Sequence, residues 1–83
     1  MTVKVQIHNA REASAIAGAA MRLHIPVTAR KGGSNADATS LLGLLSLNLS
    51  DLSEPVTLHA DSSRIPAWKE AEFMTAVNDY IAE

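Results

Sequence analysis

The feature that most constrains the fold of this chain is a change of hydrophobic period at Asn9. From Thr2 to Ile7 apolar and polar residues alternate, which predicts a strand with one buried face. Asn9 is followed at once by an alanine-rich run, and asparagine is a strong helix N-cap. Glu12 stands at the third helical position, where its side chain can complete a capping box. The sequence therefore predicts a strand that passes directly into a helix.

The alanine-rich run, Ala10–Leu23, carries its apolar residues at helical spacing. One face of the expected helix gathers Ala13, Ile16, Ala17, Ala20 and Leu23. Alanine side chains are short, so a helix with this face can lie close to a sheet. We therefore expect the run to pack on the sheet to which the first strand belongs.

The rest of the chain alternates between strand and helix signals. A Gly-Gly pair marks a tight turn, and a hydroxyl residue before a run of leucines marks a helix start. The expected segments are a strand over Ile25–Ala29, a turn at Gly32-Gly33, a short strand over Ser34–Ala38, a helix over Leu41–Leu47, a polar connection over Asn48–Glu54, a strand over Val56–Asp61, and a last helix from Pro66 to about Ala82. The last helix is expected to bury one face, made by Ala67, Ala71, Met74 and Ile81 with Trp68 and Val77 at its flanks.

The order β-α-β-β-α-β-α predicts an α+β domain over residues 1–83, with an antiparallel sheet covered on one face. The chain has 83 residues and no cysteine, so its core must hold together by packing alone. The absence of cysteine also excludes a thiol nucleophile, a disulfide framework and a thiolate-ligated zinc. The three histidines are scattered without an i, i+4 pair, so no metal site is expected.

The charge and the hydropathy of the chain argue against nucleic acid and membrane as its partners. The net charge of −2 provides no basic face for nucleic acid, and the adjacent Arg30 and Lys31 are expected in a solvated turn. No apolar stretch approaches the roughly 20 residues of a membrane span. The first residues enter a strand pattern directly, without a signal segment. These features predict a soluble, cytoplasmic domain that binds neither nucleic acid nor membrane.

Two segments resemble the histidine-containing phosphocarrier (HPr) family of the bacterial sugar phosphotransferase system. Residues 9–13, Asn-Ala-Arg-Glu-Ala, resemble the active-site run His-Ala-Arg-Pro-Ala of that family. Residues 39–47, Thr-Ser-Leu-Leu-Gly-Leu-Leu-Ser-Leu, resemble its Lys-Ser-(apolar)-Met-Gly-(apolar)-Met-Ser-Leu. The resemblance covers nearly the whole chain without a gap between the two segments. It implies an open-faced β-sandwich, a four-stranded antiparallel sheet covered on one face by three helices.

The departures from the family pattern fall at the active site. Asn9 stands where the family has the histidine that accepts phosphate, and a carboxamide nitrogen is not basic because its lone pair is delocalised. Glu12 replaces a proline and adds negative charge that would repel phosphate, although it suits the helix dipole. Arg11 is retained, and its forked guanidinium can still meet an anion. The loop before Asn9 is also shorter than usual.

His8 is the alternative phosphoryl acceptor. It is the neighbour of Asn9, it titrates near neutrality, and its neutral imidazole is nucleophilic. The alternation that turns Ile7 inward would turn His8 outward, which also fits an ordinary exposed loop histidine.

The second segment suggests regulation and docking. In one branch of the family the serine that corresponds to Ser40 is phosphorylated by a dedicated kinase, although Ser40 can also be a plain N-cap. The family docks its partners on the apolar surface of this helix, which implies partner contacts for Leu41, Leu42 and Leu45. Leu44 and Leu47 are expected to point inside.

Three functional hypotheses follow. The first is an HPr-like regulatory or protein-binding paralogue that is not an enzyme, needs no cofactor and carries no phosphate on Asn9. Its partners would be phosphotransferase-system proteins or a transcriptional regulator. The second is an active phosphocarrier that uses His8. The third is an unrelated small α+β interaction domain that shares only the topology.

Overall fold

The computed structural model describes residues 1–47 and 54–82. The predicted polar connection Asn48–Glu54 lies outside the described residues apart from Glu54. Within the described part the order β-α-β-β-α-β-α is confirmed. The elements are β1 (Thr2–Val5), α1 (Ala10–Leu23), β2 (Thr28–Lys31), β3 (Ser34–Asp37), α2 (Leu41–Leu45), β4 (Val56–His59), a 3-10 turn η1 (Ser62–Arg64), α3 (Ala67–Val77) and a second 3-10 turn η2 (Asn78–Tyr80).

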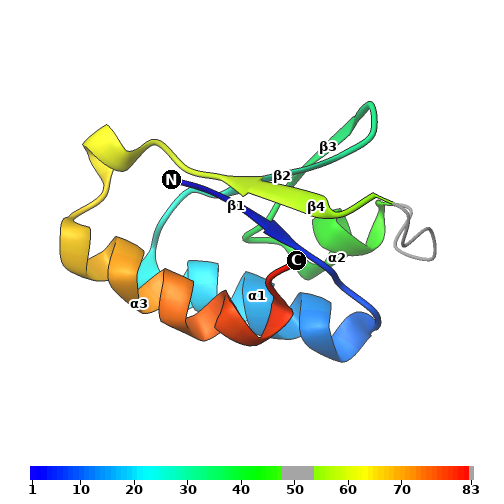
Figure 1. Cartoon of the computed structure of the whole chain (residues 1–83), viewed down its shortest axis with the longest axis horizontal. Helices are drawn as coiled ribbons and strands as arrows, with labels where there is room; N and C mark the ends of the chain where they lie inside the picture. Colours follow the sequence, from blue (N-terminus) through cyan, green and yellow to red (C-terminus); the bar gives the residue numbers. More distant parts are fainter. Residues whose placement is uncertain (48–53, 83) are drawn as a thin grey trace.

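The four strands form one antiparallel sheet in the order β1-β4-β2-β3. The helices gather on one side of this sheet, with α1 in contact with both α3 and α2 (Figure 1). No helix of the described residues lies on the opposite face of the sheet. The α+β open-faced sandwich expected from the sequence is therefore the fold of the described chain. None of its described helices is long and apolar enough to cross a membrane.

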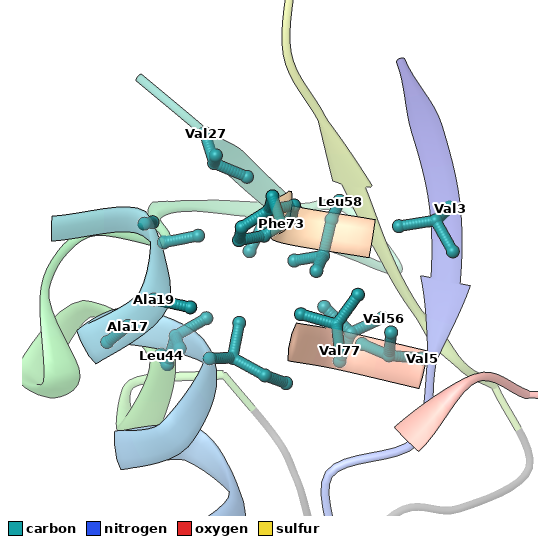
Figure 2. Packing of buried hydrophobic residues seen from close by; sticks show 14 of the residues in the cluster. Val3, Val5, Ala17, Ala19, Val27, Leu44, Val56, Leu58, Phe73 and Val77 are labelled. Carbon is teal, nitrogen blue, oxygen red and sulfur yellow. The ribbon is translucent and has the colours of Figure 1, made fainter. Parts of the chain in front are cut away.

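The core lies between the sheet and the helices. Val5, Leu58, Phe73 and Val77 point into this layer from both sides, with Leu44 at its α2 end (Figure 2). The predicted face of α1 is confirmed, since all of its members are buried: Ala13, Ile16, Ala17, Ala20 and Leu23. The alanines keep the helix backbone close to the sheet, so the thin core can still be close-packed.

The second strand was predicted too early. The sequence suggested Ile25–Ala29, whereas β2 spans Thr28–Lys31 and runs to the Gly32-Gly33 turn. Gly32 has a φ of 60°, the left-handed conformation that a two-residue hairpin turn favours and glycine adopts without strain. Pro26 lacks the N–H that a strand ladder needs, so the buried residues around it form a connection.

The prediction of a solvated turn is wrong for Lys31. Its side chain is buried in β2, and its ammonium group donates to the carbonyl oxygen of Glu54. Arg30, by contrast, is exposed as expected, because neighbouring residues of a strand point to opposite faces of the sheet.

The last helix buries a different face from the predicted one. Phe73 and Val77, an i, i+4 pair, are fully buried, whereas Trp68 is 60% exposed. Ala67 and Ala71 are also exposed, and Met74 is only partly buried. The large ring of Phe73 removes more apolar area from water than the two alanines would, so it decides which face turns inward.

The last helix also ends earlier than predicted, at Val77. The chain then turns back along the outer edge of β1, where Ile81 forms an isolated antiparallel bridge with Val5. The N–H of Gln6 donates to the carbonyl of Tyr80 at 2.8 Å. The N–H of Ala82 donates to the carbonyl of Lys4 at 2.9 Å. These contacts cover part of an edge that would otherwise offer unpaired backbone groups.

Candidate functional site

The start of α1 is closed by the side chain of Asn9. Asn9 has an extended backbone, and its Oδ1 accepts a hydrogen bond from the N–H of Glu12 at 2.9 Å. The predicted N-cap is therefore confirmed. The Asn9 side chain is therefore already engaged in holding the helix end.

The carboxylate of Glu12 reaches back one residue farther than a capping box predicts. Its Oε1 accepts from the backbone N–H of His8 at 2.8 Å and lies 2.8 Å from the Nδ1 of the same residue. The hydrogen bond from the His8 backbone, followed by the one from its ring, lowers the pKa of Glu12 below its ordinary value. Glu12 is therefore ionised at neutral pH and places a negative charge at the first turn of α1.

This contact fixes the tautomer of neutral His8. An ionised carboxylate can only accept hydrogen bonds, so Nδ1 must carry the proton that points at Glu12. The lone pair of His8 is then on Nε2. The His8 side chain is 55% exposed, as the alternation of β1 predicts. This contact was not predicted from the sequence, although the i, i+4 spacing of His8 and Glu12 was a signal for it.

Arg11 lies exposed in the first turn of α1, beside this pair. Within the described residues no side chain or carbonyl forms a hydrogen bond or ion pair with it. Its guanidinium can therefore bind an external anion without first breaking another interaction. The negative charge of Glu12 would, however, repel that anion.

The second segment forms α2, which Ser40 caps. Ser40 Oγ accepts from the N–H of Gly43 at 3.1 Å, and the Ser46 hydroxyl donates to the carbonyl of Gly43 at 2.6 Å. The N-cap expected of Ser40 is present. Because α2 contacts α1 and lies at the end of the molecule where α1 begins, the two segments share one end of the molecule (Figure 1).

The leucines of α2 divide between core and surface as predicted. Leu44 and Leu47 are buried, whereas Leu42 is 79% exposed and Leu41 and Leu45 are about half as exposed, at 38% and 41%. We call Leu41, Leu42 and Leu45 the leucine surface. Its exposure is a property of the structure, while its role in docking stays a prediction.

Asp37 stabilises the turn that precedes α2. Its Oδ1 accepts from the N–H of Thr39 at 2.9 Å and from the Thr39 hydroxyl at 2.6 Å. The hydroxyl first, and then the backbone N–H, lower the pKa of Asp37 below its ordinary 3.8. The ionised carboxylate therefore holds the turn from which α2 leaves β3.

The stability of the protein is expected to fall in acid partly through Asp37. Because the folded state lowers the pKa of this carboxyl, the stabilisation is complete above about pH 4 and is lost as the pH falls through the lowered pKa. Asp37→Asn keeps an oxygen that can accept from Thr39 but does not titrate. Urea unfolding from pH 7 to pH 2.5 should show a smaller acid loss in this variant. Identical pH profiles would contradict a role for the Asp37 charge.

Gly43 is required by the close approach of α2 to β3. A Cβ at this position would lie 2.8 Å from the carbonyl oxygen of Asp37, a backbone atom that cannot turn aside. Gly43→Ala is therefore expected to lower the free energy of unfolding by about 1–2 kcal/mol, because the clash outweighs the better helix propensity of alanine. Gly18→Ala in α1 is the matched control, since no atom lies within 4 Å of its added Cβ. It should stabilise the protein by about 0.5–1 kcal/mol in the same urea titration.

The other two histidines, His24 and His59, do not lie at the start of α1. His24 closes α1 in the left-handed conformation, and His59 lies on β4 with its Nδ1 2.9 Å from the Thr2 hydroxyl. Among the described residues, no cluster of three or more histidine, cysteine or acidic side chains could hold a metal ion.

Comparison of the sequence with models of protein families finds one matching family, and the match covers nearly the whole chain. The family model of the PTS HPr component phosphorylation site matches residues 2–83. No curated protein and no solved structure matches the chain.

Proposed function

Since this chain belongs to the family of the PTS HPr component, we propose that it is a regulatory or protein-binding member that carries no phosphate on Asn9. The observation that carries the proposal is the Asn9 cap. The carboxamide is not nucleophilic at nitrogen, and its oxygen already accepts from the N–H of Glu12. In this proposal the protein is not an enzyme and acts in the cytoplasm.

The charge at the start of α1 supports the same conclusion. A phosphoryl group is attracted to a helix N-terminus by the free N–H groups and by the positive end of the dipole. Here the ionised Glu12 lies in the first turn and offsets that attraction. Arg11 restores one positive charge beside it, so the site suits recognition of a protein surface better than storage of a phosphoryl group.

The leucine surface supports docking. Exposed apolar side chains that cluster on one short helix are typical of partner surfaces. We propose that Leu41, Leu42 and Leu45 contact phosphotransferase-system proteins or a transcriptional regulator. Ser40, half-buried at the base of this helix, is the position at which phosphorylation would add charge next to the same surface.

Leu42→Glu is expected to weaken binding to the first enzyme of the phosphotransferase system by at least about tenfold, since an apolar anchor is replaced by a charge that binding must desolvate. Because Leu42 is 79% exposed, the free energy of unfolding should change by no more than about 0.5 kcal/mol. Titration calorimetry and urea unfolding measure the two effects. Met21→Glu, at a residue 59% exposed on α1, is the control for a charge placed elsewhere. Equal losses in the two variants would place the docking surface outside α2.

The proposal is tested by incubating the protein with phosphoenolpyruvate, magnesium and the first enzyme, and following the intact mass. We expect no acid-labile phosphate together with measurable binding to the first enzyme. A stoichiometric acid-labile phosphate would reject the regulatory proposal. Absence of both phosphate and binding would instead contradict a role within the phosphotransferase system.

A second candidate function, phosphotransfer through His8, is favoured by one observation. The Glu12 carboxylate holds the proton on Nδ1 and leaves the Nε2 lone pair exposed. In such a transfer Nε2 would form the bond to phosphorus while the bond to the donor breaks. Glu12 would then neutralise the imidazolium that results. A phosphate that is lost in His8→Ala but retained in His59→Ala would establish this candidate.

A further inference from the structure

The uncovered face of the sheet is hollowed at a place where all the lining residues have polar groups. A depression of about 420 Å3 lies on it, lined by Thr2, Thr28, Arg30, Asn35, Thr57 and His59. These residues come from all four strands. A volume of this size is in the range of small-ligand sites.

The strand register arranges the side chains of this face in two rows. The first row consists of cross-strand partners and runs from Thr2 through His59 and Thr28 to Asp37. The second row runs from Lys4 through Thr57 and Arg30 to Asn35. Lys4 and Arg30 are therefore two strand spacings apart, roughly 9–10 Å, with the Thr57 hydroxyl between them.

One hydrogen bond within the second row positions the side chains of Arg30 and Asn35. Arg30 Nε donates to Asn35 Oδ1 at 3.1 Å, which fixes the guanidinium over the sheet. No other described residue accepts from Arg30, so the terminal N–H groups of its fork remain available. The Asn35 oxygen is engaged by Arg30, so its amide nitrogen is the group left to donate.

The acidic side chains that border the face are turned to other partners. Asp37 accepts from Thr39, and Asp61, which follows β4, accepts from the N–H and the hydroxyl of Ser63. None of the six lining residues is acidic. The second row is therefore a strip of hydrogen-bond donors with two positive charges, in a chain whose net charge is −2.

We propose that this face binds the phosphate group of a small hydrophilic ligand. The forked guanidinium of Arg30 matches two phosphate oxygens, and Lys4 supplies the second charge that a dianion requires. Thr57 and Asn35 donate to the remaining oxygens. The threonines of the first row and His59 face the hydroxyl groups of the rest of the ligand. This site lies on the face opposite α1 and does not depend on the proposed function of the α1 and α2 end.

Amide chemical shifts of the isotope-labelled full chain, titrated with inorganic phosphate against sodium chloride at matched ionic strength, test the proposal. We expect saturable shifts confined to the sheet strands β1, β2, β3 and β4 that chloride does not produce. Arg30→Gln should raise the dissociation constant at least tenfold. Asn35→Asp should do the same, since its carboxylate would pair with Arg30.

Arg64→Gln is the matched control, because Arg64 is an exposed arginine on η1 outside this face, and it should change the dissociation constant less than twofold. Amide spectra of each variant report whether its fold is retained. Shifts that cluster at residues 9–13, that chloride reproduces, or that survive Arg30→Gln would overturn the proposal.

Discussion

Replacing Phe73 with alanine is expected to lower the free energy of unfolding by about 3–5 kcal/mol, the largest single loss that this core offers. Phe73 is the largest of the fully buried side chains. It lies between the sheet and α3, so its removal leaves a cavity that the surrounding strands cannot fill. A domain of this size has roughly 4–12 kcal/mol in total, so the variant should be close to unfolding at room temperature. Thermal unfolding should show a Tm lower by at least about 12 °C.

Trp68→Ala on the same helix is the matched control for this loss. Trp68 is the larger aromatic residue but is 60% exposed, so its removal should cost no more than about 0.5 kcal/mol. Phe73→Leu, which keeps most of the apolar volume, should cost less than about 1.5 kcal/mol. If Trp68→Ala were the more damaging substitution, α3 would bury the face expected from the sequence instead of the one found in the structure.

The contrast between α1 and α3 shows when a helix face can be predicted from sequence. In α1 the bounds and the buried face follow directly, because Asn9 marks the start and Ile16 and Leu23 lie on the same side as the alanines. In α3 the apolar residues occur all around the helix, so spacing alone does not select a face. Weighting each residue by the area it can bury would have favoured Phe73, since one phenyl ring outweighs two methyl groups.

The sheet and the site were predictable to different degrees. The Gly32-Gly33 turn and the alternation in β1 and β4 were enough to predict the element order and an antiparallel sheet, whereas the strand order β1-β4-β2-β3 was not predicted. The start of β2 was misplaced, because Ile25 and Val27 are buried in a connection and apolar character alone cannot distinguish a strand from a buried loop. At the site, the Asn9 cap was predictable from local chemistry. The contact between Glu12 and His8 was not predicted, because a capping box directs the carboxylate to the backbone of the cap residue itself.

The resemblance to the family's run implies departures at Asn9 and Glu12, and these two residues are hydrogen-bonded to each other in the structure. The N–H of Glu12 is the donor that the Asn9 side chain accepts. A proline at this position, as in the family's run, has no N–H and leaves the side chain three residues earlier without that donor.

Asn9→His together with Glu12→Pro is therefore expected to create a phosphoryl acceptor, whereas Asn9→His alone should do so at least about tenfold more slowly. In the single variant the N–H of Glu12 remains to engage an imidazole nitrogen, and the Glu12 carboxylate remains to repel the phosphoryl group. The double variant removes both obstacles, keeps Arg11, and restores the attraction of the helix N-terminus for the anion. Acid-labile phosphate, measured by intact mass after incubation with phosphoenolpyruvate and the first enzyme, reports the difference.

Asn9→Ala with Glu12→Pro separates the imidazole from the loss of the cap. This control removes the Asn9 cap, at a cost of about 1 kcal/mol, but offers no nucleophile and should gain no phosphate. A gain that persists in this control would identify His8 as the acceptor, because its ring, released from Glu12, is the nucleophile left at the start of α1. A double histidine variant that binds the first enzyme and stays unphosphorylated would show that residues other than Asn9 and Glu12 prevent transfer. The obstacle to transfer would then not be confined to the helix cap.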